Sequence, residues 1–449
     1  MPRNHIHIVG ICGVATSALA IAFKNKGWKV TGSDKGFFPP VSLELEKHDI
    51  SFHAGWHPSK IGKPDIIMVG VASGSHNPET AYAKEFMIPA YSYPEIINKF
   101  FIKENSIVVA GTWGKTSSAA LLSFILEEAG YDPTYMFGGV SLSHKTSAKI
   151  GDGKYNIFEG DEYKSSPTDN TPKFFYYKPT HLLLTAVSWD HADLYPTEEN
   201  YFDVFKKLVS ETGFIVANRD DEGVRKIIKN AIWYGKENAK YVYSDVKQSG
   251  NGLDFKINSI NIHSPLIGSF QAENITGCFA MASELGIHEK VIIKAIEEFK
   301  GLKRRLEKRY EGEVTIFDDI AHSPEKAASV LENLKTIYNG KIIAIFEPNI
   351  GGRSLESAEK YDSAFKDADT VIIPRLTKLK VSEKKPMEGN ELAKVIRNTK
   401  LDVFYIEDDE KLVKYLVDSV NKDDVVIFLG SHGFRGMIEE LVSAYHANH

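Results

Sequence analysis

The sequence predicts an α/β protein of three domains, and two features of the chain carry this prediction. Short runs rich in β-branched residues alternate with amphipathic stretches, as where the run at 6–9 precedes the helical stretch at 15–25. Such alternation is typical of parallel strands joined by crossover helices. A chain of 449 residues is also long enough for several domains, which favours an enzyme over a small binding module.

The expected elements fall into three series, and polar stretches at 103–105 and 303–309 separate them. The first domain, over residues 1–102, is expected to hold strands at 6–9, 28–31 and 66–69 and a helix at 15–25. The second, over residues 103–308, opens with a strand at 107–110 and a helix at 116–129. The third, over residues 309–449, is expected to hold strands at 342–345, 371–373 and 425–428 and a helix at 357–368.

Composition excludes several classes of protein. Apolar residues make up 43% of the chain and charged residues 25%, which excludes a disordered, collagen-like or coiled-coil protein. The net charge of −6 makes nucleic acid and anionic membranes poor partners. Two cysteines are too few for a disulfide framework. The chain shows no signal peptide and no run of about 18 apolar residues, so we expect a cytoplasmic protein.

The strongest local signal is the segment 111–116, Gly-Thr-Trp-Gly-Lys-Thr, which follows one expected strand and opens the next helix. Backbone N–H groups and a helix N-terminus bind phosphate in that setting. We expect Lys115 to reach the terminal phosphates of a nucleotide and the Thr116 hydroxyl to bind Mg²⁺. Val109 stands where the usual motif has its first glycine, so the loop is tighter. The alternative is an ordinary glycine turn with an exposed lysine.

Polar clusters follow two further expected strands. The segment 159–162, Glu-Gly-Asp-Glu, follows the apolar run at 155–158, and the segment 190–193, Asp-His-Ala-Asp, follows the strand at 182–185. Carboxylates suit Mg²⁺, and open α/β sheets bind ligands at the carboxyl ends of their strands. Each cluster alone is most simply an acidic turn or a structural Asp–His pair. Three clusters in one domain favour a nucleotide–metal site.

The N-terminal segment 10–15, Gly-Ile-Cys-Gly-Val-Ala, matches a dinucleotide-binding fingerprint only in part. Cys12 and Ala15 stand where the second and third glycines are expected, and Asp34 lies 24 residues after Gly10, a suitable place for an acid that binds ribose. We interpret the segment as a site for a nucleotide diphosphate. A nicotinamide site and a purely structural turn are the alternatives.

The segment 317–324, Phe-Asp-Asp-Ile-Ala-His-Ser-Pro, joins an expected strand to an expected helix in the third domain. Pro324 suits the first turn of that helix. Asp and His at a strand end suit contact with ribose, phosphate or substrate, and a helix cap is the alternative.

Taken in order, these motifs resemble those of the Mur ligase family, the ATP-dependent ligases of peptidoglycan precursor synthesis. The resemblance covers nearly the whole chain and includes segments 31–34, 268–274 and 304–307. It implies an N-terminal Rossmann-like domain for a UDP-sugar, a central P-loop ATPase-like domain and a C-terminal Rossmann-like domain for the acceptor.

Within the family, segments 10–13, 161–163, 190–193 and 433–434 are most similar to the ligase of peptidoglycan recycling. This implies that UDP-N-acetylmuramate is joined to the tripeptide L-alanyl-γ-D-glutamyl-meso-diaminopimelate through an acyl phosphate. The member of the family that adds L-alanine in de novo synthesis is the alternative.

The resemblance also implies roles for individual residues. Lys115, His191 and His322 are placed at the reacting groups. ATP is assigned to Gly111, Thr112, Gly114, Lys115, Thr116, Ser117, Gln271, Asn274, Arg305 and Asp319; the UDP-sugar to Gly10, Cys12, Gly13, Val14, Asp34 and Ser73; and Mg²⁺ to Thr116, Glu159 and His191. Lys206, 15 residues after His191, stands where some members carry a carbamylated lysine that bridges to Mg²⁺. An exposed helix lysine is the alternative.

The chain departs from the family pattern at Trp113, Ala186, Ser188 and Asn349 and in the segment 164–172. These positions are expected near the reacting groups and the acceptor, so they leave the acceptor open. A catalytically idle nucleotide-binding regulator and a nicotinamide oxidoreductase remain as alternative functions.

Overall fold

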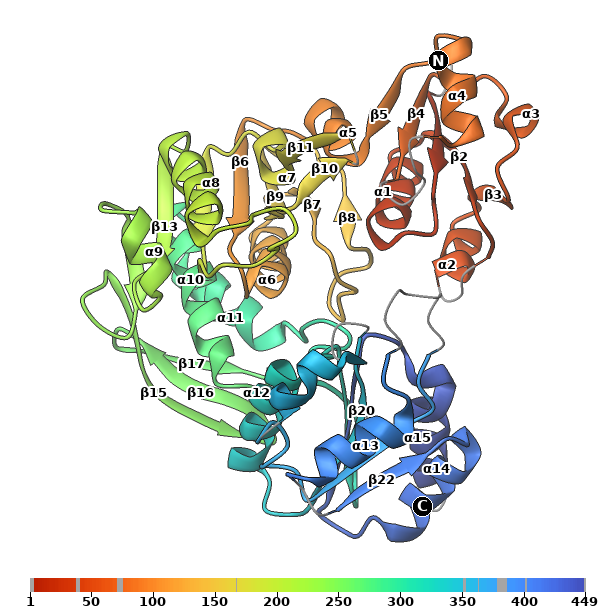
Figure 1. The fold of residues 1–449 in the computed structure, drawn as a ribbon. Helices are drawn as coiled ribbons and strands as arrows, with labels where there is room; N and C mark the ends of the chain where they lie inside the picture. Colours follow the sequence, from red (N-terminus) through yellow and green to blue (C-terminus); the bar gives the residue numbers. More distant parts are fainter. Residues whose placement is uncertain are drawn as a thin grey trace. The chain divides into compact units, whose positions relative to one another are not determined.

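The structure is a computed structural model that describes residues 4–37, 41–70, 76–166, 168–349, 353–361, 363–377, 386–399 and 402–447. The chain forms two compact units (Figure 1), one of residues 1–246, 255–264 and 272–300, and one of residues 247–254, 265–271 and 301–449. Two large sheets lie in the first unit and one in the second. The three-domain α/β architecture predicted from the sequence is confirmed, whereas the exact domain limits remain a prediction.

The first sheet has five parallel strands in the order β3-β2-β1-β4-β5. Its elements are β1 His5–Val9, α1 Val14–Asn25, β2 Lys29–Asp34, α2 Val41–Lys47, β3 Ser51–Ala54, α3 Pro58–Ile61, β4 Ile66–Val69, α4 Pro78–Glu85, β5 Ala90–Ser92 and α5 Tyr93–Phe100. Ile6 and Ile8 pack with α1 and α5, whereas Val9 packs with α3 and α4 on the other face. The strand order reverses at β1, and such switch points are where open sheets bind ligands.

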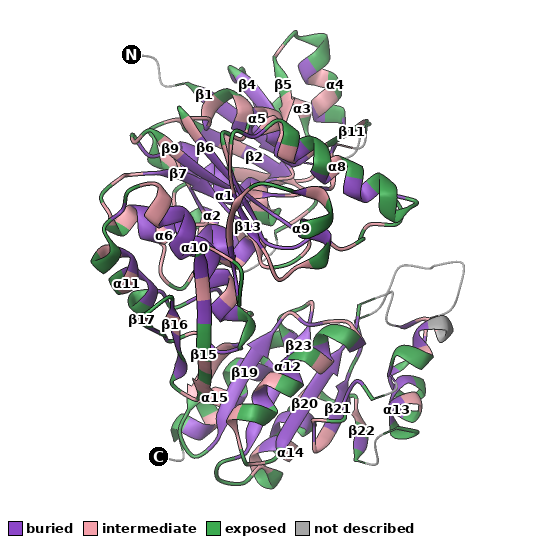
Figure 2. Ribbon diagram, turned by 90° about the vertical axis from the view of Figure 1, so that its left-hand side faces the viewer, coloured by how far each residue is buried: buried purple, intermediate pink, exposed green. Residues whose placement is uncertain are grey.

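The second sheet has ten strands in the order β17-β16-β15-β14-β13-β12-β6-β9-β7-β8. Its elements, with the small hairpin β10-β11, are β6 Asn105–Ala110, α6 Lys115–Glu128, β7 Thr134–Met136, β8 Ala148–Lys149, β9 Tyr155–Gly160, β10 Lys164–Ser166, β11 Asp169–Pro172, α7 Lys173–Tyr176, β12 His181–Leu184, α8 Glu198–Ser210, β13 Phe214–Asn218, α9 Glu222–Ile227, β14 Ile232–Gly235, β15 Tyr241–Ser249, β16 Gly252–Ile257, β17 Ile260–Ser264, α10 Phe270–Glu284 and α11 Glu289–Glu298. Its central strands are almost fully buried, as expected where helices cover both faces of a parallel sheet (Figure 2).

The third sheet has six strands in the order β18-β19-β23-β20-β21-β22, all parallel except β18. Its elements are β18 Glu307–Glu311, β19 Thr315–Asp319, α12 Pro324–Ile337, β20 Ile342–Glu347, the 3₁₀ helix η3 Leu355–Tyr361, β21 Thr370–Pro374, α13 Gly389–Arg397, β22 Val403–Ile406, α14 Asp409–Ser419, β23 Val425–Gly430, the 3₁₀ helix η4 Phe434–Gly436 and α15 Met437–Ala447. Pro324 opens α12, as predicted, and the Ser323 side chain caps it.

One expected element is wrong. The α-helix predicted over 357–368 is a 3₁₀ helix that ends at Tyr361, and turns occupy residues 363–367. Tyr361, Phe365 and Ala368 are buried at the spacing that predicted the helix. The Ser357 hydroxyl donates to the Ser354 carbonyl, a local bond that favours a tight turn.

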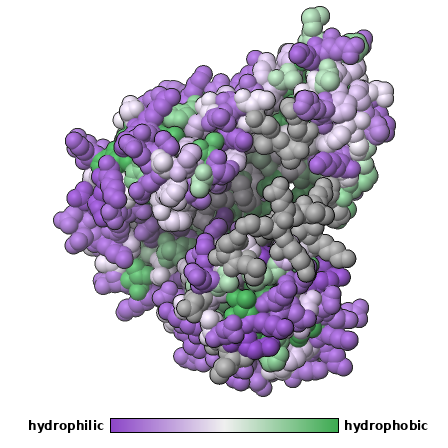
Figure 3. All heavy atoms as spheres, in the orientation of Figure 1, coloured by the Kyte–Doolittle hydropathy of each residue, from purple (hydrophilic) through white to green (hydrophobic). Residues whose placement is uncertain are grey.

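Hydrophilic side chains predominate on the face that Figure 3 shows, with small hydrophobic areas between them. Within the described ranges, no helix combines the length and the apolar character needed to cross a membrane.

Candidate active site

Three neighbouring strands of the central sheet bring the predicted motifs together. β6 pairs with β9 on one side and β12 on the other, and Ala110 at the end of β6 lies opposite both Gly160 and Leu184. The segments 111–116, 159–162 and 185–191 therefore leave the same edge of the sheet side by side. This is the carboxyl edge, where parallel α/β sheets bind ligands.

The loop between β6 and α6 depends on its two glycines. Gly111 has a φ of 142°, and a Cβ there would lie 2.2 Å from Thr185 Oγ1 and 2.8 Å from the Ala186 amide nitrogen. Gly114 is in the left-handed region with a φ of 80°, and a Cβ there would lie 2.4 Å from Asn274 Oδ1. The close approach of the β12 end explains why this tighter loop needs glycine at 111. The loop leaves the N-terminus of α6 open to a phosphate.

Lys115 in the first turn of α6 contacts a buried carboxylate. Its Nζ lies 3.1 and 2.9 Å from the two oxygens of Glu162, whose side chain is 1% exposed. The Tyr201 hydroxyl donates to the same carboxylate at 3.3 Å. A buried carboxylate needs such partners because the charge has lost its water.

Thr116 and Glu159 place hard oxygen atoms beside the loop. The Thr116 hydroxyl donates to Glu159 Oε1 at 2.7 Å, and the Gly138 amide donates to Oε2 at 2.6 Å. Mg²⁺ is usually bound by one or two protein oxygens together with phosphates and waters, so this pair fits the ion in the presence of a nucleotide. In the described part of the chain, no group of three His, Cys, Asp or Glu side chains is arranged to hold a metal by itself.

His191 also contacts Glu162. Its Nε2 lies 3.5 Å from Glu162 Oε1, and the hydrogen bond with this carboxylate raises the pKa of the imidazole although burial opposes the shift. The residue has a φ of 55°, and the Asp190 carboxylate accepts its amide N–H at 2.7 Å. Lys115 and His191 thus share one buried carboxylate.

Asp161 lies between Glu159 and Glu162 in the motif, and its partner is a different lysine. Its carboxylate forms an ion pair with the buried Lys173 of α7. Burial opposes ionisation, but Lys173 and the Tyr163 amide outweigh it and lower the pKa of Asp161. Each of the three carboxylates of this motif therefore has a separate partner.

The remaining residues assigned to ATP lie around this loop or in the second unit. Thr112 accepts the Ser188 amide N–H at 2.9 Å, and Ser117 lies partly buried in the first turn of α6. Gln271 and Asn274 are buried on α10. Lys206 lies on α8 with its side chain 51% exposed, 2.8 Å from Asp203.

The N-terminal loop has the form expected of a phosphate-binding turn. Gly10 is in the left-handed region with a φ of 81°, and Gly13 caps α1, which begins at Val14. Asp34 Oδ2 accepts the Cys12 amide N–H at 2.8 Å. Asp34 therefore shapes the loop, and its role toward ribose stays a prediction. Ser73 lies outside the described residues.

In the second unit, Asp319 is buried and both of its oxygens accept backbone N–H groups, from Ala321 and Leu306, each at 2.7 Å. Burial raises the pKa of its carboxyl group. Arg305 is exposed beside Leu306, and His322 Nδ1 lies 2.7 Å from the Ile320 carbonyl. The contacts of Asp319 hold the turn that presents Arg305.

The departures from the family pattern leave the loop contacts intact. Trp113 is 59% exposed between the two glycines. Ala186 and Ser188 contact the loop through their backbones, with the Ala186 carbonyl accepting the Thr112 amide and the Ser188 carbonyl accepting the Thr112 hydroxyl, each at 2.9 Å. The backbone N–H of Asn349 donates to the His322 carbonyl at 3.1 Å.

The sequence motifs indicate no individual role for Glu162, Lys173 or Arg304. Glu162 lies in the same motif as Glu159, so its position on the strand end was a usable signal. The Arg304 guanidinium contacts Asp318 and the backbone carbonyls of residues 430–432. The three carbonyls are more than 100 residues away in the sequence, and no local pattern indicates them.

The fold and the glycine loop define an α/β nucleotide-binding protein with a P-loop on its central sheet. Three family models match consecutive parts of the chain: the Mur ligase family catalytic domain over residues 5–104, the Mur ligase middle domain over 109–282 and the Mur ligase glutamate ligase domain over 304–432. The chain belongs to the Mur ligase family, and it is an enzyme of the ATP-dependent ligase class.

Individual relatives match over nearly their whole length. UDP-N-acetylmuramate–L-alanine ligase of Pelagibacter ubique is 29% identical over 462 residues, covering 97% of each chain. The enzyme of the same name from Acetivibrio thermocellus is 29% identical, covering 95% of this chain and 93% of the relative.

Two solved structures share the fold. The UDP-N-acetylmuramate–alanine ligase of Thermotoga maritima has a TM-score of 0.82 at 22% identity, covering 99% of this chain and all of that one. A murein peptide ligase of Psychrobacter arcticus has a TM-score of 0.69 at 23% identity, covering 98% of each chain.

Proposed function

We propose that the chain joins the carboxylate of UDP-N-acetylmuramate to the amine of an acceptor at the expense of ATP, in peptidoglycan synthesis. The observation that carries this proposal is the juxtaposition of Lys115 and Thr116 with Glu162 and Glu159 at one strand edge. Such a site suits phosphoryl transfer, in which positioning and charge neutralisation supply most of the catalysis.

Activation by phosphate is needed because a carboxylate is a poor electrophile. In the proposed sequence the muramyl carboxylate attacks the γ-phosphorus, giving an acyl phosphate and ADP. The acceptor amine then attacks the acyl carbon, and phosphate leaves with the C–O bonding electrons. The amine loses a proton, so the products are an amide, ADP and phosphate.

The chain's residues supply positioning for these steps. The loop amides and the N-terminus of α6 orient the phosphates, and Lys115 leaves Glu162 to contact the phosphate that is transferred. Thr116 and Glu159 would hold Mg²⁺, which neutralises phosphate charge when bound. His191 stays on Glu162 and keeps that carboxylate partly neutralised.

The domain roles follow the sequence prediction. Residues 1–102 bind the UDP-sugar at the Gly10–Val14 loop and Asp34, residues 103–308 bind ATP, and residues 309–449 bind the acceptor. Arg305, near the end of the second domain, and His322, in the third, contact the reactants.

L-alanine is the acceptor that the comparisons favour. The relatives from Pelagibacter ubique and Acetivibrio thermocellus carry the name of L-alanine ligases, as does the structure from Thermotoga maritima. The recycling ligase predicted from the sequence is not confirmed. The tripeptide stays as a second candidate because of the segments 161–163 and 433–434 and the shared fold with a murein peptide ligase.

A phosphate-release assay tests the proposal with ATP, Mg²⁺ and UDP-N-acetylmuramate, comparing L-alanine, the tripeptide and longer peptides. We expect release with L-alanine. Release with the tripeptide alone favours the second candidate. If none of the acceptors leads to phosphate release, a catalytically idle nucleotide-binding regulator is indicated. A change in the absorbance of an added nicotinamide cofactor indicates an oxidoreductase.

A further inference from the structure

A buried carboxylate contacts the N-terminal sheet at a position far in the sequence from the Gly10–Val14 loop. Glu79, in the first turn of α4, is 0% exposed. It accepts hydrogen bonds from the Ser33 hydroxyl of β2 and from the His57 amide at 2.8 Å. Its Oε1 lies 3.1 Å from His53 Nε2 of β3, and its Oε2 lies 3.7 Å from His7 Nε2 of β1. These five residues, here called the Glu79 cluster, join three strands to α4.

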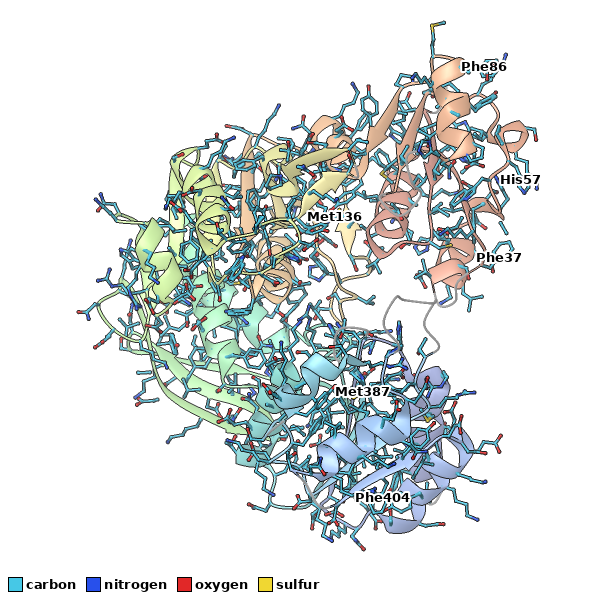
Figure 4. All side chains as sticks on the ribbon, viewed as in Figure 1. Phe37, His57, Phe86, Met136, Met387 and Phe404 are labelled. Carbon is cyan, nitrogen blue, oxygen red and sulfur yellow. The ribbon has the colours of Figure 1, made fainter. Side chains whose placement is uncertain are left out.

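The partners of Glu79 favour the ionised form of its carboxyl group. Burial opposes ionisation, but the nearby His7 ring and the hydrogen bonds from Ser33 and His57 lower the pKa of Glu79 to about 2. Burying a charge is costly even with partners, and apolar side chains of similar size pack a core without that cost. Packing alone therefore does not account for a carboxylate here. His57, which Figure 4 labels, lies in the segment between β3 and α3.

Ser33 connects the Glu79 cluster to the Gly10–Val14 loop. While its hydroxyl donates to Glu79, its carbonyl oxygen accepts the Gly10 amide at 2.8 Å and the Ile11 amide at 3.0 Å. The next residue, Asp34, accepts the Cys12 amide at 2.8 Å. Two consecutive residues at the end of β2 thus fix three consecutive amides of the loop, and Glu79 fixes the first of those two residues.

We propose that Glu79 is a positioning residue for the UDP-sugar: through Ser33 it holds the Gly10–Val14 loop in the shape that receives the diphosphate. This inference rests on the proposed function, in which that loop binds the UDP-sugar. Glu79 does not touch the ligand. It acts on the loop through one side-chain bond and two backbone bonds.

The test is a calorimetric titration of UDP-N-acetylmuramate into the wild-type protein and Glu79→Gln. The amide keeps the shape of the side chain but places an NH₂ group among donors, so the bond from Ser33 or from His57 is lost. We expect the Kd for the UDP-sugar to rise about tenfold. The Kd for ATP and the kcat at saturating UDP-sugar are expected to change less than about twofold. Glu85→Gln, at the exposed end of α4, is the matched control and is expected to leave every value unchanged.

A purely structural role predicts a different pattern, in which the melting temperature falls and all three values change together. If Glu79→Gln binds the UDP-sugar as tightly as Glu85→Gln does, the inference is overturned. If Glu79→Gln does not fold, Ser33→Ala decides, because it removes only the hydroxyl. A rise in Kd of about threefold supports the inference, and an unchanged Kd contradicts it. Absence of UDP-sugar binding in the wild-type protein instead contradicts the proposed function.

Discussion

Lys115 Nζ lies within 3.1 Å of both oxygens of Glu162, so the lysine of the phosphate-binding loop is paired with a buried carboxylate before any nucleotide arrives. A phosphate and Glu162 compete for the same ammonium group. We expect Lys115→Ala to lower ATP turnover by about 10²-fold or more, because the variant lacks the positive charge that contacts the transferred phosphate. Binding of the UDP-sugar is expected to persist. Turnover at the wild-type rate in this variant would reject the P-loop assignment.

The competition between Glu162 and phosphate makes a second prediction. Glu162→Gln leaves Lys115 without a counter-charge, so the free energy of unfolding of the free protein should fall by about 2 kcal/mol. Nucleotide phosphates restore that charge, so ATP should raise the melting temperature of Glu162→Gln by more than that of the wild-type protein. Glu211→Gln, an exposed change at the end of α8, is the control. Equal ATP-induced shifts in all three proteins would show that Lys115 and Glu162 are not coupled to the nucleotide.

Glu159 should govern the dependence on Mg²⁺. We expect Glu159→Gln to raise the Mg²⁺ concentration for half-maximal turnover about tenfold, because one of the two oxygen donors beside the loop is weakened. Thr116→Ser keeps the hydroxyl that donates to Glu159 and should stay within about threefold of the wild-type value. A magnesium titration of activity checks both variants. An unchanged titration for Glu159→Gln would remove Glu159 from the metal site.

Whether Lys206 is carbamylated can be tested directly. Lys206 is half-exposed and paired with Asp203 on the same helix, and surface pairs of this kind contribute little stability. We expect Lys206→Ala to keep wild-type activity within about twofold, with and without added bicarbonate. A large loss of activity, together with bicarbonate stimulation of the wild-type enzyme, would instead indicate a carbamylated lysine.

Glu273 on α10 should make the protein less stable as the pH rises. Burial raises its pKa to about 7, and the nearby carboxylates Asp220 and Asp221 add to the shift. A carboxyl group whose folded-state pKa lies above its unfolded-state value costs stability once the pH exceeds the unfolded value, and the cost is complete above the folded value. Thermal unfolding should therefore show that Glu273→Gln is more stable than the wild-type protein by a larger margin at pH 8 than at pH 5, the two margins differing by on the order of 1 kcal/mol or more. An equal change at both pH values would contradict the shift.

The sequence predicts the parts of this protein that follow from local patterns. The alternation of strands and helices gives the α/β class, and the positions of the segments 111–116, 159–162 and 190–193 at strand ends are predicted because parallel strands share an edge. The partner of Lys115 is not predicted, because the pairing of Glu162 with both Lys115 and His191 depends on β9 and β12 flanking β6. The Glu79 cluster is missed for the same reason, since three strands and α4 must assemble before its members meet.

The proposed function requires that the amide forms through an acyl phosphate. The most direct measurement uses UDP-N-acetylmuramate with ¹⁸O in its carboxylate, together with ATP, Mg²⁺ and L-alanine or the tripeptide, and determines the mass of the phosphate released. We expect one ¹⁸O atom to move from the carboxylate into each phosphate formed with the amide. Phosphate without ¹⁸O, or amide formed without phosphate, would contradict it.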